Sequence, residues 1–417
     1  MNTVLQNKRL LGINGIGRIG KLTLWNHLNM KHFDGIVINA GREIGKSMED
    51  VMQYLSTDST YGSLDRFMYG YSGKTCDVKL IDAEERIIEM DGIPVKILTT
   101  ARNPRDIEWN KEGVRIVVDC TGVFLDPTVP ADHPKGSLRG HLEAGAEKVI
   151  LSAPFKIKDS SRKMPEDSGM FVYGINHMKY DPMKHHVISA TSCTTTGLSH
   201  MMKPLVSTEE TSRIVTASMT TVHAATNNQS ILDAAPGAGS GDLRKDRSLF
   251  NNIIPTSTGA AIALEEVMPE IKSIGFMADS IRVPTSTVSL ISLNLTFHTT
   301  LTENGEPVIT KEFINDVYKK ASEGAQKGLL FFSSNQNVSS DLMGIQAAIV
   351  IEGQENHTRT GFLPLNADTL SRLGIEVTQD ANLPVTHAKI FGWYDNEFGS
   401  YVNCLGKLTK YLDKNLI

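Results

Sequence analysis

Short apolar runs rich in valine and isoleucine recur through the N-terminal third of this 417-residue chain, separated by segments with helical spacing. They occupy residues 9–14, 35–40, 115–120 and 148–153. A strand that is apolar along its whole length is buried on both faces, which is typical of a parallel sheet covered by helices on both sides. The sequence therefore predicts a doubly wound α/β domain at the start of the chain.

The character of the sequence changes after about residue 210. The segments "RIVTASMTTVHAAT" and "TSTVSLISLNLTFHTT" are long, rich in threonine, serine and valine, and alternate between polar and apolar residues. Such alternation predicts extended antiparallel strands with one face in contact with water. A second domain of α+β type is therefore expected, and the chain is long enough for two domains that each have a core.

The composition argues against several classes of protein. A formal net charge of −5 gives no basic surface for nucleic acid. The four cysteines show no CxxC pair and no zinc-like spacing with histidine, so we expect reduced thiols and no bound metal. The N-terminal segment lacks the apolar core of a signal peptide, and no segment has the roughly 18 apolar residues of a membrane span. We expect a cytoplasmic protein without membrane contacts.

The segment "GINGIGRIG" carries the pattern Gly15-x-Gly17-x-x-Gly20 between the first apolar run and an amphipathic helix. Structural glycine turns match this pattern too, but the strand–turn–helix context favours a dinucleotide-binding loop. In such a loop Gly15 makes the tight turn, Gly17 lets the backbone approach the pyrophosphate, and Gly20 lets the helix pack on the strand. The helix N-terminus then faces the phosphates.

The acidic residue that usually accompanies this loop is missing. In NAD-binding domains an acid about 20 residues further on, at the end of the second strand, holds the ribose 2′-hydroxyl. Ala40 occupies that position. Without a carboxylate nothing there repels a 2′-phosphate, and Arg42 is near enough in sequence to pair with one. The alternative is that Arg42 is only a solvated loop charge.

Cys193 lies in "SATSCTTTGLSH", a pattern that predicts a strand leading into a helix with Thr191 or Ser192 as the N-cap. A thiol in the first helical turn is favoured as thiolate, and the unpaired N–H groups of that turn can stabilise an oxyanion. A small buried hydrophobic residue is equally consistent with the local sequence. His223, on an expected strand, is a candidate base, although a core histidine would look the same.

Segments that span nearly the whole chain, in order, resemble the phosphorylating glyceraldehyde-3-phosphate dehydrogenase family. They are "GINGIGRIG", "MQYLSTDSTYG", "DCTGVF", "ILSAP", "SCTTTGLSHMMKPL", "TTVHAAT", "NNIIPTSTGAAIAL", "IRVPTSTVSL" and "WYDNEFGSYVNCL". The resemblance implies a Rossmann-type doubly wound domain, residues 1–192 and 394–417, to which the C-terminal helix returns. It also implies an α+β catalytic domain, residues 193–393, with a mostly antiparallel sheet.

By the same resemblance, Cys193 is the nucleophile and His223 the base of a covalent mechanism. The thiolate attacks the aldehyde to give a hemithioacetal, His223 takes its hydroxyl proton as hydride leaves for the nicotinamide, and inorganic phosphate cleaves the resulting thioester. The implied substrates are glyceraldehyde 3-phosphate and inorganic phosphate, with NAD or NADP as cofactor. The implied assembly is a homotetramer.

The resemblance also implies residues that bind substrate and cofactor. Thr226 and Arg282 match the subsite for the substrate phosphate, although each threonine taken alone is more typical of a strand surface. The subsite for attacking phosphate corresponds to Ser192, Thr194, Thr258 and Gly259, with Arg247 near both subsites. The residues expected at the cofactor are Asn14, Gly15, Ile16, Gly17, Arg18, Ile19, Gly20, Ala40, Arg42, Arg102, Thr121, Ser152 and Asn396, the last of which fixes the carboxamide.

The chain departs from the family pattern in three places. Thr196 stands where the family has asparagine, and Gly197 where a second cysteine is common. In "ILDAAPG", Ala234 and Ala235 match a bulky Leu-Pro pair of NAD-specific relatives. Together with Ala40, these small residues resemble the NADP-using branch, so we expect NADP to be preferred and NAD retained.

Extra residues lie around positions 158–167 and 344–389. In the second stretch the alternating "AAIVIEG" and "GIEVTQD" could form an additional hairpin. Two other functions stay open. The first is erythrose-4-phosphate dehydrogenase, against which Thr226 argues. The second is a nucleotide-binding paralogue without activity, against which the presence of Cys193, His223 and Arg282 argues.

Overall fold

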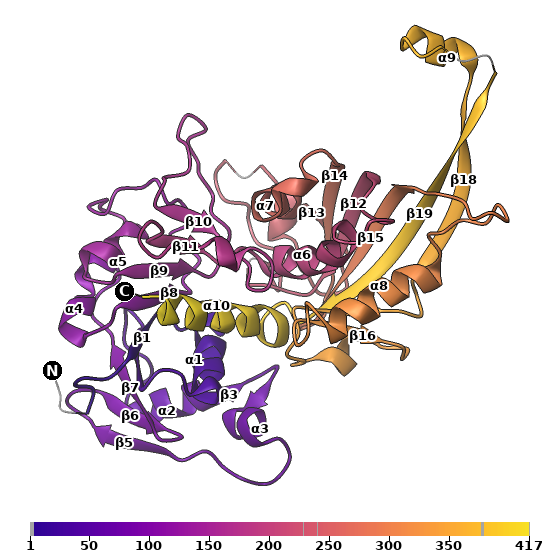
Figure 1. The fold of residues 1–417 in the computed structure, drawn as a ribbon. Coiled ribbons are helices and arrows are strands. Elements are labelled where there is room, and N and C mark those ends of the chain that lie inside the picture. The colour runs from indigo at the N-terminus through magenta and orange to yellow at the C-terminus, as the bar shows by residue number, and fades with distance from the viewer. Residues whose placement is uncertain (1–3, 228, 240, 377–378, 417) are drawn as a thin grey trace. The chain divides into compact units, whose positions relative to one another are not determined.

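The computed structural model describes residues 4–227, 229–239, 241–376 and 379–416 (Figure 1). The chain divides into two compact units, of which the first is Met1–Thr196 with Glu397–Ile417 and the second is Gly197–Asn396. Helix α6, Cys193–Val206, crosses from the first unit into the second. The functional domain limits expected at 192/193 and 393/394 stay a prediction.

The first unit is built on a nine-stranded sheet with the order β10-β11-β9-β8-β1-β2-β7-β6-β5. Neighbouring strands from β10 to β7 run parallel, and β6 and β5 add an antiparallel edge. The strand order reverses at β1 and β8, and open α/β sheets bind ligands at such a switch point, beyond the carboxyl ends of the strands. The strands are β1 Leu10–Asn14, β2 Gly35–Asn39, β5 Val78–Asp82, β6 Ile87–Met90, β7 Ile93–Leu98, β8 Ile116–Asp119, β9 Lys148–Leu151, β10 Ser168–Met170 and β11 Val187–Ser189.

The predicted doubly wound domain is confirmed by the burial of these strands. Every residue of β1, β2, β8 and β9 is buried, because helices cover both faces of the sheet. Trp25 of α1 is fully buried, and its Nε1 donates to Leu55 O at 2.6 Å. The helices of the unit are α1 Arg18–Met30, α2 Met48–Ser56, α3 Leu64–Tyr69, α4 Trp109–Glu112, α5 Arg139–Glu143, the π-helix η6 Phe398–Val402 and α10 Asn403–Lys414, with short turns η1 Pro104–Asp106 and η2 His177–Lys179 and the small pair β3 Thr57–Asp58 and β4 Gly62–Ser63.

The second unit holds an eight-stranded sheet with the order β13-β14-β12-β15-β19-β17-β16, and β18 pairs with β19. The pairs β12/β14 and β16/β17 are parallel and the others antiparallel, so the expected mostly antiparallel sheet is confirmed. Its strands are β12 Ile214–His223, β13 Ile254–Ser257, β14 Gly275–Arg282, β15 Ser289–His298, β16 Leu330–Ser333, β17 Ile349–Glu352, β18 His357–Leu365 and β19 Ala381–Tyr394. Its helices are α7 Ala260–Val267, α8 Lys311–Glu323 and α9 Ala367–Arg372, with short turns η3 Leu243–Asp246, η4 Pro269–Ile271 and η5 Ser339–Leu342.

The alternation seen in the sequence sets the two faces of this sheet. In β15, Ile291, Leu293 and Leu295 are fully buried, while Leu290 and Ser292 are only half-buried. Helix α8 packs against β16 of the same sheet, starts at the N-cap Thr310 and buries Ile314, Val317 and Tyr318. β12 and β15 pair antiparallel, as their sequences predict.

The extra hairpin is present but forms from other residues than the alternating pattern indicates. "AAIVIEG" contains β17, a strand inside the sheet. "GIEVTQD" includes residues outside the described part of the chain, and its described residues form no strand. The hairpin consists of β18 and the outer end of β19, and Figure 1 shows both strands extending past their neighbours with α9 near the tip. Backbone pairing with β15 determines which residues of β19 belong to the sheet. The alternation of polar and apolar residues in the sequence does not predict which strands pair.

The other extra stretch, residues 158–167, forms neither helix nor strand. Within the described ranges of the chain, every helix is too short or too polar to cross a membrane.

Candidate active site

The glycine loop connects β1 to α1 through close backbone contacts. Gly15 has φ +90°, a conformation that favours glycine, and its N–H donates to Asn39 O at 2.9 Å. A Cβ on Gly20 would lie 1.9 Å from Gly15 O, so only glycine lets α1 approach the turn this closely. A Cβ on Gly17 would meet nothing within 4 Å. The loop therefore leaves open space at Gly17, directly before the helix N-terminus, where a phosphate fits.

The residues next to these glycines are tied to the rest of the first unit. Ile16 O accepts a hydrogen bond from Tyr54 Oη at 2.6 Å. Arg18 forms an ion pair with Glu397 at 3.0 Å and a hydrogen bond with Thr60. Ile19 packs against the core cluster of the unit. The loop is therefore held from both sides.

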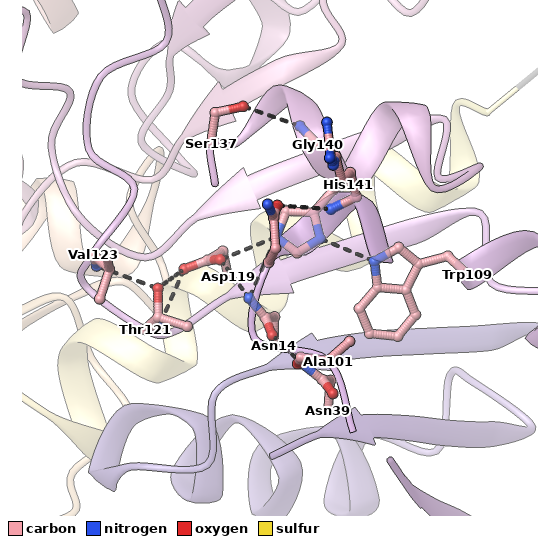
Figure 2. A network of polar contacts seen from close by, with 12 residues as sticks. Asn14, Asn39, Ala101, Trp109, Asp119, Thr121, Val123, Ser137, Gly140 and His141 are labelled. Atoms are coloured by element: carbon pink, nitrogen blue, oxygen red, sulfur yellow. Dashed lines mark hydrogen bonds and ion pairs between the residues drawn. The ribbon is translucent and has the colours of Figure 1, made fainter. Parts of the chain in front are cut away.

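Figure 2 shows a buried polar network at the carboxyl ends of β1, β2 and β8. Asp119 is fully buried, and its Oδ2 accepts from Asn14 Nδ2 at 2.8 Å and from His141 Nε2 at 3.0 Å. Its Oδ1 accepts from the backbone N–H and the hydroxyl of Thr121 at 3.0 and 2.6 Å. One carboxylate thus orients two of the residues expected at the cofactor, Asn14 and Thr121.

The protonation of this network follows from Trp109. The indole N–H can only donate, and it donates to His141 Nδ1 at 2.9 Å. His141 Nδ1 is therefore an acceptor, so the ring proton lies on Nε2 and points to Asp119. Burial by itself would raise the pKa of Asp119, but hydrogen bonds from His141, Thr121 and Asn14 outweigh it and hold the pKa below its ordinary value.

The turn that follows β2 carries positive rather than negative charge. Ala40 donates its N–H to Leu98 O at 2.8 Å and is followed by Gly41 with φ +65°. Arg102 Nε donates to Gly41 O at 3.2 Å, and Arg42 is exposed. The nearby carboxylate of Glu43 is bound by both Arg86 nitrogens at 2.7 and 2.8 Å. Ser152 lies apart from this turn, with its N–H on Asp119 O at 2.9 Å.

Cys193 is the first residue of α6, as the sequence predicts. Ser192 caps the helix, because its Oγ accepts from Thr195 N at 3.0 Å and its carbonyl accepts from Thr196 N at 2.9 Å. The Cys193 side chain is half-buried, and Thr194 is buried beside it in the sequence. The helix dipole favours the thiolate at this position.

His223, at the end of β12, is held as a neutral base. Its Nδ1 lies 2.8 Å from Ala224 O, and since a carbonyl only accepts, Nδ1 carries the proton and Nε2 the lone pair. Burial, followed by the positive charge of Arg282, lowers the pKa of His223 to about 3. Arg282 lies beside His223 in the parallel pairing of β12 and β14, and its guanidinium donates to Ala224 O at 3.3 Å.

The expected anion-binding residues of the second unit fall into two groups. Arg282 lines a cavity of about 680 Å³ together with Gln229, Arg244 and Lys245. Thr226 is connected to this cavity through Gln229, whose Oε1 accepts from the Thr226 N–H and hydroxyl at 2.9 and 2.8 Å.

The remaining anion-binding residues lie on other segments. Thr258 and Gly259 immediately precede α7, where the Thr258 hydroxyl accepts from Ala260 N at 3.3 Å. Arg247 is paired with Asp233 at 3.1 Å on the surface and does not line the cavity.

Asn396 is connected to the base through a residue that the sequence did not single out. Ser289 Oγ donates to Asn396 Oδ1 at 3.1 Å and accepts from Ala224 N at 3.0 Å. Ser289 and His141 escaped prediction because their partners are distant in sequence, whereas Gln229 binds the nearby Thr226 and no motif singled it out. Only the position of Ser289 at the start of the alternating segment hinted at a structural role.

The structure therefore distributes the expected residues over both units. The glycine loop, the turn after β2, Thr121, Ser152 and the start of α6 belong to the first unit. His223, the anion-binding residues Thr226, Arg247, Thr258, Gly259 and Arg282, and Asn396 belong to the second.

A doubly wound unit with a glycine loop and a helix-capped cysteine, joined to a unit with a neutral histidine beside arginine, defines the class of NAD-dependent oxidoreductases. The family model of the glyceraldehyde 3-phosphate dehydrogenase NAD binding domain matches residues 9–127, and that of the C-terminal domain matches residues 192–364. The chain belongs to the glyceraldehyde-3-phosphate dehydrogenase family.

Relatives from three bacteria support this assignment over nearly the full length. The chain is 34% identical to a glyceraldehyde-3-phosphate dehydrogenase of Streptomyces coelicolor over 410 residues, 97% of this chain and 99% of the relative. It is 34% identical to glyceraldehyde-3-phosphate dehydrogenase 1 of Bacillus subtilis over 97% of this chain and 98% of the relative. It is also 34% identical to a glyceraldehyde-3-phosphate dehydrogenase of Geobacillus stearothermophilus, over 96% of this chain and 97% of the relative.

The glycine loop gives a prediction that separates packing from cofactor binding. In Gly20→Ala the new Cβ clashes with Gly15 O, so the melting temperature should fall by about 5 °C or more. In Gly17→Ala the Cβ has space and the backbone angle of −68° suits alanine, so stability should hold while cofactor affinity falls about tenfold. Differential scanning calorimetry and cofactor titration measure both quantities. Equal melting temperatures for the two variants would contradict the packing argument.

The electrostatics of His223 give a second prediction. Because Arg282 is one of the two causes that lower the pKa of His223 to about 3, Arg282→Gln should raise that pKa, although burial keeps it below 6.5. As the pH falls, this histidine is protonated in the unfolded chain near pH 6.5 and in the folded protein only near pH 3, so the free energy of unfolding decreases between these two values. In the variant the decrease should end at a higher pH, because the pKa of the folded state is higher. NMR titration of the histidine ring measures the shift. Arg213→Gln, which removes the same charge just before the opposite end of β12, should leave it unchanged.

Proposed function

We propose that this protein catalyses the reversible phosphorylating oxidation of glyceraldehyde 3-phosphate to 1,3-bisphosphoglycerate. The observation that carries the proposal is the position of Cys193 as the first residue of a helix capped by Ser192. This cysteine occurs in a chain that aligns over 97% of its length with a glyceraldehyde-3-phosphate dehydrogenase of Streptomyces coelicolor.

Cys193 would act as the nucleophile. Its place at the positive end of α6 favours the thiolate, which attacks the aldehyde carbon. The oxygen that becomes negative takes up the proton that the thiol gave to His223, and the product is a hemithioacetal. N–H groups of the first helical turn are suited to stabilise the oxyanion that develops on the former carbonyl oxygen.

His223 would act as the base. Its Nε2 carries the lone pair, so this nitrogen takes the hemithioacetal hydroxyl proton as the carbon loses hydride and becomes a thioester. The low pKa of His223, about 3, keeps the ring neutral before the reaction, and a bound substrate phosphate beside Arg282 would bring that pKa closer to the working range.

Phosphate groups would be bound by both units. Thr226 and Arg282 would hold the substrate phosphate, and Ser192, Thr194, Thr258 and Gly259 the attacking phosphate, with Arg247 serving either anion. An oxygen of the attacking phosphate bonds to the thioester carbon, and the Cys193 thiolate leaves. The cavity that Arg282 lines contains the basic Arg244 and Lys245 and the acidic Asp242 and Asp246, so its lining carries a small excess of positive charge, which favours an anion.

The cofactor would be held by the glycine loop, with the space at Gly17 receiving the pyrophosphate. Asn14, Thr121 and Ser152, oriented by Asp119, would line the ribose and nicotinamide part, and Asn396 would fix the carboxamide. When bound, the nicotinamide ring accepts the hydride. Ser289 would hold Asn396 in register with the end of β12.

An activity assay tests the proposed reaction. The purified protein should form reduced cofactor from glyceraldehyde 3-phosphate only when inorganic phosphate is present, and Cys193→Ser should abolish turnover because serine is not ionised by a helix dipole. Cys76→Ser is the matched control, since the pKa of the Cys76 thiol is raised to about 11 by burial, and it should retain activity. Turnover in Cys193→Ser above a few per cent of the wild type would sink the covalent mechanism.

The same assay separates the other candidate functions. A higher kcat/KM with erythrose 4-phosphate would reassign the substrate. Cofactor binding without turnover of either sugar phosphate would identify a nucleotide-binding paralogue.

We also propose that NADP is preferred over NAD. The place of the ribose-binding acid is taken by Ala40, the exposed Arg42 makes no hydrogen bond or ion pair with other described residues, and Arg102 is anchored beside it on Gly41. The carboxylate nearest in sequence, Glu43, is neutralised by Arg86. A 2′-phosphate would therefore meet positive charge at this turn.

The cofactor preference can be reversed by one substitution. Ala40→Asp should shift the kcat/KM ratio toward NAD by about tenfold or more, since a charged hydrogen bond to the ribose is gained and a 2′-phosphate repelled. Ala83→Asp adds the same charge at an exposed turn of the same unit and should leave the ratio unchanged. A wild type that favours NAD tenfold would overturn the preference.

By family resemblance we further propose a cytoplasmic homotetramer as the working form.

A further inference from the structure

Thr191, two residues before Cys193, has a backbone conformation that threonine rarely adopts. Its φ is +61°, in the left-handed region, where a β-branched side chain is strained. The residue is fully buried, and its Oγ1 has no hydrogen-bond partner among the described residues. The side chain therefore offers nothing that offsets the strain, and the conformation must be imposed from outside.

Hydrogen bonds to the backbone of Thr191 impose it. The Thr191 N–H donates to Ser189 Oγ at 3.0 Å, and Ser189 Oγ in turn donates to Ala153 O at 2.7 Å. On the other side, Tyr401 Oη donates to Thr191 O at 3.0 Å. Both polar groups of Thr191 are thus fixed immediately before Ser192 caps the helix and Cys193 begins it.

Tyr401 lies in an uncommon type of helix, which places its hydroxyl at the Thr191 carbonyl. Residues Phe398–Val402 form a π-helix, in which Val402 N donates to Glu397 O at 2.9 Å, and π-helical turns are rare and concentrated at functional sites. Tyr401 is 4% exposed. Burial, with smaller effects of the Cys193, Cys120 and Cys404 thiols, raises its pKa well above the ordinary value, so the hydroxyl stays a donor.

We propose that Tyr401 is a positioning residue for Cys193. Its hydroxyl holds the strained turn at Thr191, and this turn sets the direction in which the chain enters α6 and hence where the thiol lies in the first helical turn. The strain is retained because an unstrained turn would start the helix differently. The proposal rests on the proposed role of Cys193 as nucleophile.

The first experiment replaces the hydroxyl alone. Tyr401→Phe should lower kcat and the rate of Cys193 alkylation by iodoacetamide about five- to tenfold, the effect of one lost hydrogen bond. The affinity for NAD and NADP should change less than twofold. Tyr411→Phe, which removes a tyrosine hydroxyl from the following helix α10, is the control and should leave both rates unchanged.

A double-mutant cycle separates positioning from general stabilisation. Glycine adopts a positive φ without a Cβ penalty, so in Thr191→Gly the turn should keep its conformation without the hydrogen bond from Tyr401. In that background Tyr401→Phe should change the alkylation rate less than twofold. If Tyr401→Phe lowers only the melting temperature, or if the two substitutions act additively on the alkylation rate, the positioning role is wrong.

Alkylation, located at Cys193 by mass spectrometry, does not require turnover. An enzyme that fails to oxidise glyceraldehyde 3-phosphate would therefore overturn the proposed function and still leave the coupling between Tyr401, Thr191 and the thiol to be decided by the alkylation rates.

Discussion

A single buried carboxylate organises the nucleotide-binding half of this molecule. Asp119 has no exposed surface, and among the described residues its carboxylate accepts four hydrogen bonds, one from Asn14, one from the neutral His141 ring and two from Thr121. Such a group is costly when any donor is missing. The ends of β1 and β8 and the helices α4 and α5 must therefore come together in one arrangement, which also fixes the side chains of Asn14 and Thr121.

In the second unit a buried histidine, His223, is kept uncharged. His223 shares its carbonyl partner, Ala224 O, with Arg282, so the imidazole and the guanidinium are held side by side in neighbouring strands. Burial first, and then the permanent charge of the guanidinium, lowers the pKa of His223 and keeps the ring neutral. If Arg282 and His223 have the roles proposed above, an anion bound at Arg282 would also change the pKa of His223, and anion binding and proton transfer would be linked.

Local patterns in the sequence were enough for much of the fold and the site. The apolar runs, the glycine loop and the N-cap of α6 depend on residues close together along the chain, and these features are confirmed by the burial of β1 and β2 and by the Ser192 cap. The contacts of His141 and Ser289 depend on tertiary packing, which no local pattern reports. Gln229 binds the nearby Thr226, but its place beside Arg282 in the cavity depends on the fold. The hairpin was assigned to the wrong segments for the same reason, since pairing with β15 determines where β19 lies. The left-handed Thr191 runs against the preference of its residue type, and propensity would never have selected it.

Strand β19 pairs with β15 along its inner part and with β18 along its outer part. The length of the hairpin formed by β18 and β19 is therefore independent of the geometry near the inner end of β19. From Val385 to Tyr394 the strand pairs with β15, while residues 381–383 pair with β18 and not with β15. The register of the inner part is thus set before the strand leaves the sheet. A change in the length of the projecting end would therefore leave the pairing that holds Tyr394 in place.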